Sequence, residues 1–238
     1  MSANTIRLSA ALLVALPLTL SQAAQAAPAA KPETIKYSAE VKLLSDGIYR
    51  GVSQTEGRPQ YIVGGQAAYG KFFAGVLYKS MRDRTTGVDN QTQAILGYKT
   101  NLAGNDIVAR AIYKQYNGTK AGIDNEWMEY EFTATRKLTK RLSGKLNFAY
   151  ADDNYGKAKT ATYTELGLDY KVTPKLSFQV ANGFRHNRHS VDYTSYLAGV
   201  SYAVTPKFMA SLTFTATDKG DLGDKYGEST FITLSKKF

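Results

Sequence analysis

From Lys36 onward the sequence alternates apolar and polar residues with a period of two, and this pattern restricts the possible folds more than any other feature. In segment 207–217, for example, Phe208, Leu212 and Phe214 alternate with polar residues. Successive side chains of a β-strand point to opposite faces, so each such segment has one apolar face and one polar face. The pattern therefore predicts an all-β protein.

The alternating segments are too long for an ordinary globular sheet. Most contain about 10–13 residues, whereas a globular strand has about 5–6 and a tilted transmembrane strand about 9–11. A mean hydropathy of −0.32 does not argue against a membrane barrel, because alternating strands average out to a polar value. We count twelve segments: 36–50, 60–69, 71–81, 90–100, 106–117, 125–137, 142–152, 160–172, 175–185, 193–204, 207–217 and 228–238.

Short and long connections alternate strictly between these segments. The short ones are 69–71, 100–105, 138–141, 173–174 and 205–206, and the long polar ones are 53–60, 82–89, 118–124, 153–159, 186–192 and 218–227. Outer-membrane barrels have short periplasmic turns and long extracellular loops. The sequence VTPK occurs at 172–175 and again at 204–207, where proline sets the bend of a turn. We therefore predict a transmembrane antiparallel up-and-down β-barrel of twelve strands over residues 36–238.

The N-terminal residues have the three regions of a secretory signal peptide. Arg7 supplies the positive charge, residues 10–20 the apolar stretch, and Ala24-Gln25-Ala26 the cleavage site. We expect residues 1–26 to be cleaved as a signal peptide and residues 27–35 to form a flexible lead-in. The chain has no cysteine, so disulfides and thiolate metal sites are excluded. These features predict export to the outer membrane of a Gram-negative bacterium.

Three stretches resemble one family of bacterial barrels. SDGIYRGVSQTEGRPQ (45–60) resembles the first strand and loop of the TorF-type porin family of proteobacterial outer-membrane proteins, GGQAAYGKFFAGV (64–76) its second hairpin, and ITLSKKF (232–238) its ending. The resemblance implies an outer-membrane barrel and supplies no substrate. The terminal Phe238 resembles the signal read by the barrel-assembly machinery, a predicted partner, although Lys236 departs from the usual pattern.

Charged residues on the polar faces predict a charge-lined lumen. A basic side chain in lipid at mid-depth would cost about 2–4 kcal/mol. Rings of charged side chains select ions in pores, but opposite charges can also pair and fill a barrel, and twelve strands lie between filled and open barrels. The predicted pore-lining residues are Lys42, Arg110, Lys114, Glu129, Glu131, Lys145, Glu165, Asp169, Lys171 and Arg185, with Glu40 on the same face as Lys42.

Two functions fit this pattern. The first is a porin-like channel for passive diffusion of small hydrophilic solutes or ions. The alternative is a closed structural or adhesive barrel whose long loops bind lipopolysaccharide or a partner. Its candidate phosphate-binding cations are Arg82, Arg84, Lys120, Arg188 and Lys219. The predicted partners are outer-membrane lipid, lipopolysaccharide and small polar solutes. The net charge of +10 is scattered along the chain, so we do not expect nucleic-acid binding.

No enzymatic constellation is evident in the sequence. His186, His189 and Ser190 share a loop, but they lack the spacing of a nucleophile, base and orienting group. A hydrolase barrel would depend on that loop alone. The acidic loop residues Asp218, Asp221, Asp224 and Glu228 do not match the calcium-loop pattern. We therefore expect no catalytic residues, no bound metal and no cofactor.

Overall fold

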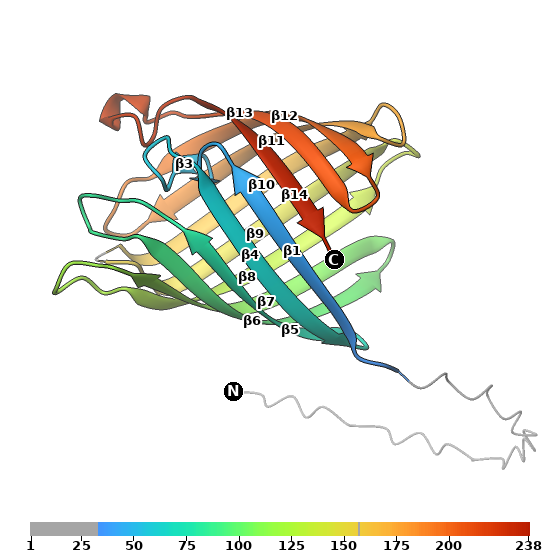
Figure 1. Cartoon of the computed structure of the whole chain (residues 1–238), viewed down its shortest axis with the longest axis horizontal. Helices are drawn as coiled ribbons and strands as arrows, with labels where there is room; N and C mark the ends of the chain where they lie inside the picture. The colour runs from blue at the N-terminus through green and yellow to red at the C-terminus, as the bar shows by residue number, and fades with distance from the viewer. Residues whose placement is uncertain (1–32, 157) are drawn as a thin grey trace, which may run out of the picture. The chain divides into compact units, whose positions relative to one another are not determined.

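A computed structural model describes residues 33–156 and 158–238. Within these residues the chain forms a closed antiparallel β-barrel of twelve strands, in the order β1-β14-β13-β12-β11-β10-β9-β8-β7-β6-β5-β4 (Figure 1). The predicted fold class and strand number are therefore confirmed. The predicted signal peptide, 1–26, and residues 27–32 of the predicted lead-in lie outside the described residues.

The barrel strands agree with the predicted segments to within two residues at each end, apart from the first. They are β1 (Lys36–Leu44), β4 (Gln60–Tyr69), β5 (Phe72–Ser80), β6 (Asn90–Leu102), β7 (Asn105–Asn117), β8 (Glu126–Lys137), β9 (Leu142–Asn154), β10 (Lys159–Lys171), β11 (Leu176–Asn187), β12 (Tyr193–Thr205), β13 (Phe208–Thr217) and β14 (Ser229–Lys237). The two short strands β2 (Ile48–Tyr49) and β3 (Val52–Ser53) pair only with each other, and η1 (Gly220–Leu222) is a single turn of 3₁₀-helix.

The first and last barrel strands close the sheet. On one side β1 pairs with β14, from Glu40 opposite Lys237 to Leu44 opposite Thr233, and on its other side it pairs with β4. In Figure 1 the blue β1 and the red β14 lie side by side. Closure leaves no free edge, so the backbone groups of all twelve strands can be satisfied within the sheet.

Large apolar side chains cover the outside of the barrel. On β10, Leu166 and Leu168 are exposed by 57% and 44%, while Glu165 and Asp169 alternate with them on the inner face. The same alternation recurs around the barrel, with exposed side chains such as Val76, Leu96 and Phe184. Soluble proteins rarely expose apolar surface on this scale, so the outer face is suited to lipid.

The repeated turn sequence is explained by its threonine. In the turn after β10, Thr173 Oγ1 accepts hydrogen bonds from the backbone N–H groups two and three residues on, at 3.2 and 2.9 Å. Thr205 does the same after β12 at 3.3 and 3.0 Å. Thr139 does so after β8, at 3.2 and 3.0 Å, although lysine stands there in place of proline. The shared threonine therefore holds the turn, and proline adds to it in two copies.

The predicted first strand, 36–50, is wrong beyond Leu44. The backbone leaves the sheet at Ser45, and Asp46 anchors the departure through three hydroxyl groups. Its Oδ1 accepts from Ser53 Oγ at 2.7 Å and Thr55 Oγ1 at 3.0 Å, and its Oδ2 accepts from Ser229 Oγ at 2.9 Å. A buried carboxylate satisfied in this way fixes a turn that leads away from the barrel wall. The first long loop therefore begins at Ser45, not at Ser53.

Within the described part of the chain, no helix is long and apolar enough to cross a membrane.

Candidate functional site

Residues 48–53 form a small β-hairpin, here called the lumen hairpin. Its two-residue turn is Arg50-Gly51, with φ of 54° and 83°. Two-residue turns with both φ values positive match the twist of a hairpin, but they usually contain Asn-Gly. An arginine in the left-handed conformation is strained by about 1–2 kcal/mol. Such strain persists where surrounding contacts hold the residue in place.

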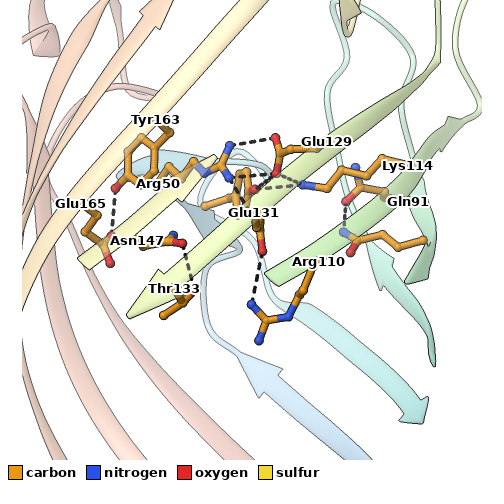
Figure 2. A network of polar contacts seen from close by, with 12 residues as sticks. Arg50, Gln91, Arg110, Lys114, Glu129, Glu131, Thr133, Asn147, Tyr163 and Glu165 are labelled. Atoms are coloured by element: carbon orange, nitrogen blue, oxygen red, sulfur yellow. Dashed lines mark hydrogen bonds and ion pairs between the residues drawn. The ribbon is translucent and has the colours of Figure 1, made fainter. Parts of the chain in front are cut away.

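Those contacts are the ion pairs of Arg50 with strand β8. Its Nη1 donates to Glu129 Oε2 at 3.0 Å, and its Nη2 donates to Glu129 Oε1 at 2.9 Å and to Glu131 Oε1 at 3.2 Å (Figure 2). The guanidinium also lies over the rings of Tyr49 and Tyr163, 4.6 and 4.8 Å from their centroids. The side chains of Arg50 and Glu129 are only 5% and 3% exposed. A bidentate arginine–carboxylate ion pair of this kind is strong because its hydrogen bonds are short, well oriented and buried.

Lys114 and Tyr49 complete the surroundings of Glu129. Lys114 Nζ donates to Glu129 Oε1 at 2.6 Å and to Tyr49 Oη at 3.0 Å. Burial raises the pKa of Tyr49 well above its ordinary value, so its phenol stays protonated and donates to Glu129 Oε1 at 3.2 Å. One carboxylate thus accepts hydrogen bonds from Arg50, Lys114 and Tyr49. We call these four residues the Glu129 cluster.

The lumen hairpin also touches the opposite wall of the barrel. A Cβ atom added to Gly51 would lie 2.5 Å from Ser195 Cβ on β12 and 3.3 Å from Thr217 Cγ2 on β13. Behind the hairpin, Gln54 Oε1 accepts from Lys79 Nζ of β5 at 2.6 Å. The hairpin therefore contacts β5 and β8 on one side and β12 and β13 on the other, so it crosses the lumen.

Replacing the turn glycine should weaken the barrel. For Gly51→Ala we expect the free energy of unfolding to fall by about 1–3 kcal/mol, because alanine is strained at positive φ and its Cβ overlaps Ser195. Urea unfolding of the detergent-folded protein measures the change. Gly57→Ala is the matched control, since Gly57 has φ of 73° in the same loop and no atom within 4 Å of its added Cβ. Equal losses in the two variants would mean that the contact across the lumen contributes nothing.

Four of the predicted pore-lining residues lie together in the structure. Arg110 Nη1 is 3.6 Å from Glu131 Oε2, next to the Glu129–Lys114 pair (Figure 2). The other predicted residues make separate contacts. Lys145 pairs with Glu165 at 3.4 Å and Lys42 with Glu40 at 3.2 Å. Arg185 lines the same cavity as Arg50 and Glu129, and its Nε donates to Asn187 Oδ1 at 3.0 Å. Asp169 and Lys171 follow Glu165 on the same face of β10, toward its short turn.

The set of predicted pore-lining residues lacked the residues that join this network across the lumen. Arg50 and Tyr49 fall in the predicted first strand, 36–50, and Lys79 and Tyr163 are not among the predicted pore-lining residues. The available signal was the Arg50-Gly51 pair, since a glycine-containing dipeptide between short β-prone stretches is a hairpin signal. The contact of Arg50 with Glu129, 79 positions later, has no counterpart in a local pattern.

Positive charge is in excess around the lumen hairpin. Arg50, Arg110, Arg185 and Lys114 stand against two carboxylates, Glu129 and Glu131, which leaves two positive charges uncompensated. Among the described residues, no carboxylate is within ion-pair distance of Arg185. The amine of Lys79 likewise has Gln54 and the ring of Tyr49 as neighbours. The arrangement favours anions over cations.

A cavity of about 790 Å³, here called the loop-side cavity, lies between the lumen hairpin and the long loops. Its walls carry both aromatic and charged side chains, among them Trp127, Tyr155 and Arg185. Ion pairs tie the surrounding loops together: Lys225 Nζ is 3.1 Å from Asp83 Oδ2, and Glu56 pairs with both Arg82 and Arg84. The cavity size falls within the usual range for ligand-binding pockets.

The remaining candidate residues are loop contacts. His186 Nδ1 lies 2.7 Å from Asp192 Oδ2, and both side chains are exposed. The pKa of Asp192 is lowered below its ordinary value, mainly by the hydrogen bond from the backbone N–H of Asn187 and further by His186. In residues 33–156 and 158–238, no three side chains of His, Cys, Asp or Glu gather as a metal site, the acidic loop 218–228 included.

Solved structures with the same fold include porins. The chain resembles the KdgM porin in complex with disordered oligogalacturonate (TM-score 0.58, 11% identity, 84% of this chain and 98% of that chain) and the NanC porin (TM-score 0.58, 9% identity, 84% and 98%). It also resembles the translocator domain of the autotransporter NalP from Neisseria meningitidis (TM-score 0.50, 12% identity, 85% and 88%). At these identities the likeness shows the fold alone.

Sequence comparison places the chain in a bacterial family. No match was found among curated proteins. Residues 26–236 match the profile of the family described as "Bacterial protein of unknown function (Gcw_chp)". The TorF-type name stays a prediction, because neither the profile nor the solved structures carry it. The match spans nearly the whole chain, and the protein is thus a member of the bacterial Gcw_chp family with a porin-like barrel fold.

Proposed function

We propose that the protein is a porin-like channel of the bacterial outer membrane that passes small hydrophilic solutes by diffusion and prefers anions. The observation that carries this proposal is the excess of positive charge where the lumen hairpin crosses the barrel. A solute on this route would pass between the hairpin and the wall, where Arg110 and Arg185 attract negative charge. Solutes would be selected by their size and by the electric field of the charged side chains in the lumen, without a catalysed reaction.

The comparisons support the proposal at the level of fold. The similar barrels include two porins, and one of them was solved with oligogalacturonate, which is a polyanion. The similar NalP domain is a translocator, so the fold by itself does not select one mode of transport. The TorF-type resemblance, which is to porins, also favours a channel.

The closed barrel remains the second candidate, and the lumen hairpin is the observation that favours it. A hairpin held on both walls reduces the open cross-section of a twelve-stranded barrel. Most of the loop cations that could contact lipopolysaccharide already have partners within the protein. Arg82 and Arg84 pair with Glu56, and Lys120 Nζ donates to Thr85 O at 2.8 Å, so three of the five loop cations are already engaged.

Planar-bilayer recording separates the two functions. We expect the folded protein to conduct, and its reversal potential in a KCl gradient to show anion preference. The double variant Arg110→Gln/Arg185→Gln should lose most of that preference, because it removes the two arginines that remain in excess after Glu129 and Glu131 are set against Arg50 and Lys114. Arg58→Gln is the control, since Arg58 is an exposed arginine of the first loop. A correctly folded but silent protein would favour the closed barrel, and cation preference would refute the proposed selectivity.

A further inference from the structure

One wall of the loop-side cavity is an aromatic cluster. The ring centroids of Tyr116 and Trp127 are 4.8 Å apart, those of Tyr116 and Tyr155 are 4.5 Å apart, and those of Trp127 and Tyr155 are 6.0 Å apart. The rings come from β7, β8 and the loop after β9, so three separate segments build the wall. Residues of all three segments line the cavity.

The indole of Trp127 on this cavity lacks a partner: its Nε1 is a buried donor with no hydrogen-bond partner among the described residues. The other polar groups of this wall are engaged, since Arg82 Nε lies 3.4 Å from Glu56 Oε2 and Tyr155 interacts with Thr86. Trp127 is only 8% exposed. Leaving a buried donor without a partner costs about 1–3 kcal/mol, so such groups are rare in native proteins. The unpartnered indole N–H points to a ligand with a hydrogen-bond acceptor, such as a hydroxyl group, at this wall.

Arg185 is the cation on this cavity that remains available to a ligand. Arg50 and Lys114 also line it, but both are bound to Glu129. Two further lining cations, Arg82 and Lys225, pair with Glu56 and Asp83. Arg185 uses Nε for Asn187, and none of its contacts is a carboxylate of the described residues, so its Nη groups can bind an anion. The planar guanidinium fork matches a carboxylate with two parallel hydrogen bonds.

The distance between Trp127 and Arg185 sets the length of the ligand. Trp127 is on β8 and Arg185 on β11, three inter-strand steps apart, which is about 14 Å along the sheet. The chord across the curved wall is shorter than this arc but exceeds one sugar ring. A ligand that reaches both features therefore needs two or three rings, which the cavity volume accommodates.

We propose that the loop-side cavity binds an acidic saccharide of two or three rings. Its carboxylate binds Arg185, and a sugar ring packs on the Trp127–Tyr155 faces, with hydroxyl groups accepting hydrogen bonds from Trp127 Nε1. Aromatic side chains suit this role because they combine a broad apolar face with a polar edge. The proposal rests on the proposed channel function and names the class of solute that it would admit.

Trp127 is the single tryptophan of the chain, so its intrinsic fluorescence reports on this cavity alone. We would titrate the detergent-folded full barrel with digalacturonate and with its neutral counterpart, galactobiose. We expect a saturable fluorescence change with digalacturonate and at least about tenfold weaker binding of galactobiose. Arg185→Gln should weaken digalacturonate binding about tenfold and leave galactobiose unchanged. Arg188→Gln, which removes an exposed arginine three residues on, should change neither.

A calorimetric titration of Trp127→Phe tests the other end of the site. Because this variant loses the indole N–H and keeps an aromatic face, we expect weaker binding of both sugars. Equal binding of the acidic and neutral sugars would overturn the role of Arg185. The absence of saturable binding to a conducting, anion-preferring barrel would overturn the inference and leave the proposed channel standing. Saturable binding to a folded barrel that does not conduct would uphold the saccharide site and overturn the proposed channel.

Discussion

Excising the lumen hairpin is expected to raise the single-channel conductance roughly twofold or more. The hairpin crosses the lumen of a twelve-stranded barrel, whose width lies between that of barrels filled by side chains and that of barrels with an open channel. The structure indicates where to cut. Gln54 N donates to Gly47 O at 2.7 Å, so replacing residues 48–53 by Gly-Gly turns this bond into the i to i+3 bond of a β-turn. The anchor of Asp46 with Thr55 is kept. Single-channel recording in planar bilayers measures the effect.

Two variants show whether the hairpin backbone or its arginine limits the current. Arg50→Ala keeps the hairpin and removes the side chain, and we expect an intermediate conductance. Arg58→Ala removes an exposed arginine of the same loop and should leave the conductance unchanged. If excision leaves the current of a folded barrel unaltered, the hairpin does not lie on the conducting path.

Glu129→Gln is expected to lower the free energy of unfolding by about 3–5 kcal/mol, because it leaves Arg50 and Lys114 buried without their shared counter-charge. The amide keeps the size of the carboxylate, so the loss would be electrostatic and not due to a cavity. Glu129 is 2% exposed and Lys114 is 3% exposed, so water cannot replace the lost partner. Equilibrium unfolding by urea in detergent or lipid vesicles measures the change.

Glu165→Gln is the matched control on the same inner face. Its pair with Lys145 is longer, at 3.4 Å, and the lysine side chain is 39% exposed, so we expect a loss below about 1 kcal/mol. In the double variant Glu129→Gln/Lys114→Gln, part of the stability should return, because one of the two uncompensated cations is gone. Equal losses in Glu129→Gln and Glu165→Gln would show that burial of the Glu129 cluster has no energetic weight.

Much of the candidate site could be predicted as a set of inward charges but not as a network. Arg110, Lys114, Glu129 and Glu131 occupy polar positions of long alternating strands, and β7 and β8 are sequence neighbours that pair in an up-and-down barrel. Arg110 and Glu131 are direct partners in that pairing, so their contact follows from strand order. By contrast, Lys42 and Lys145 occupy equivalent polar positions, yet they pair with Glu40 and Glu165 and not with Glu129.

The sequence by itself determined the barrel, because strand formation here depends on a local period of two, on segment length and on turns held by their own threonines. These signals lie within about a dozen residues, and they placed eleven strands correctly. Only the tertiary structure decided the path of residues 45–53. Their local pattern also fits a strand, but Asp46 finds one of its three hydroxyl partners, Ser229, on a distant segment, and Arg50 finds both of its carboxylates there. Long-range burial of charge outweighs the local strand preference there, and that burial exists only once the barrel has closed.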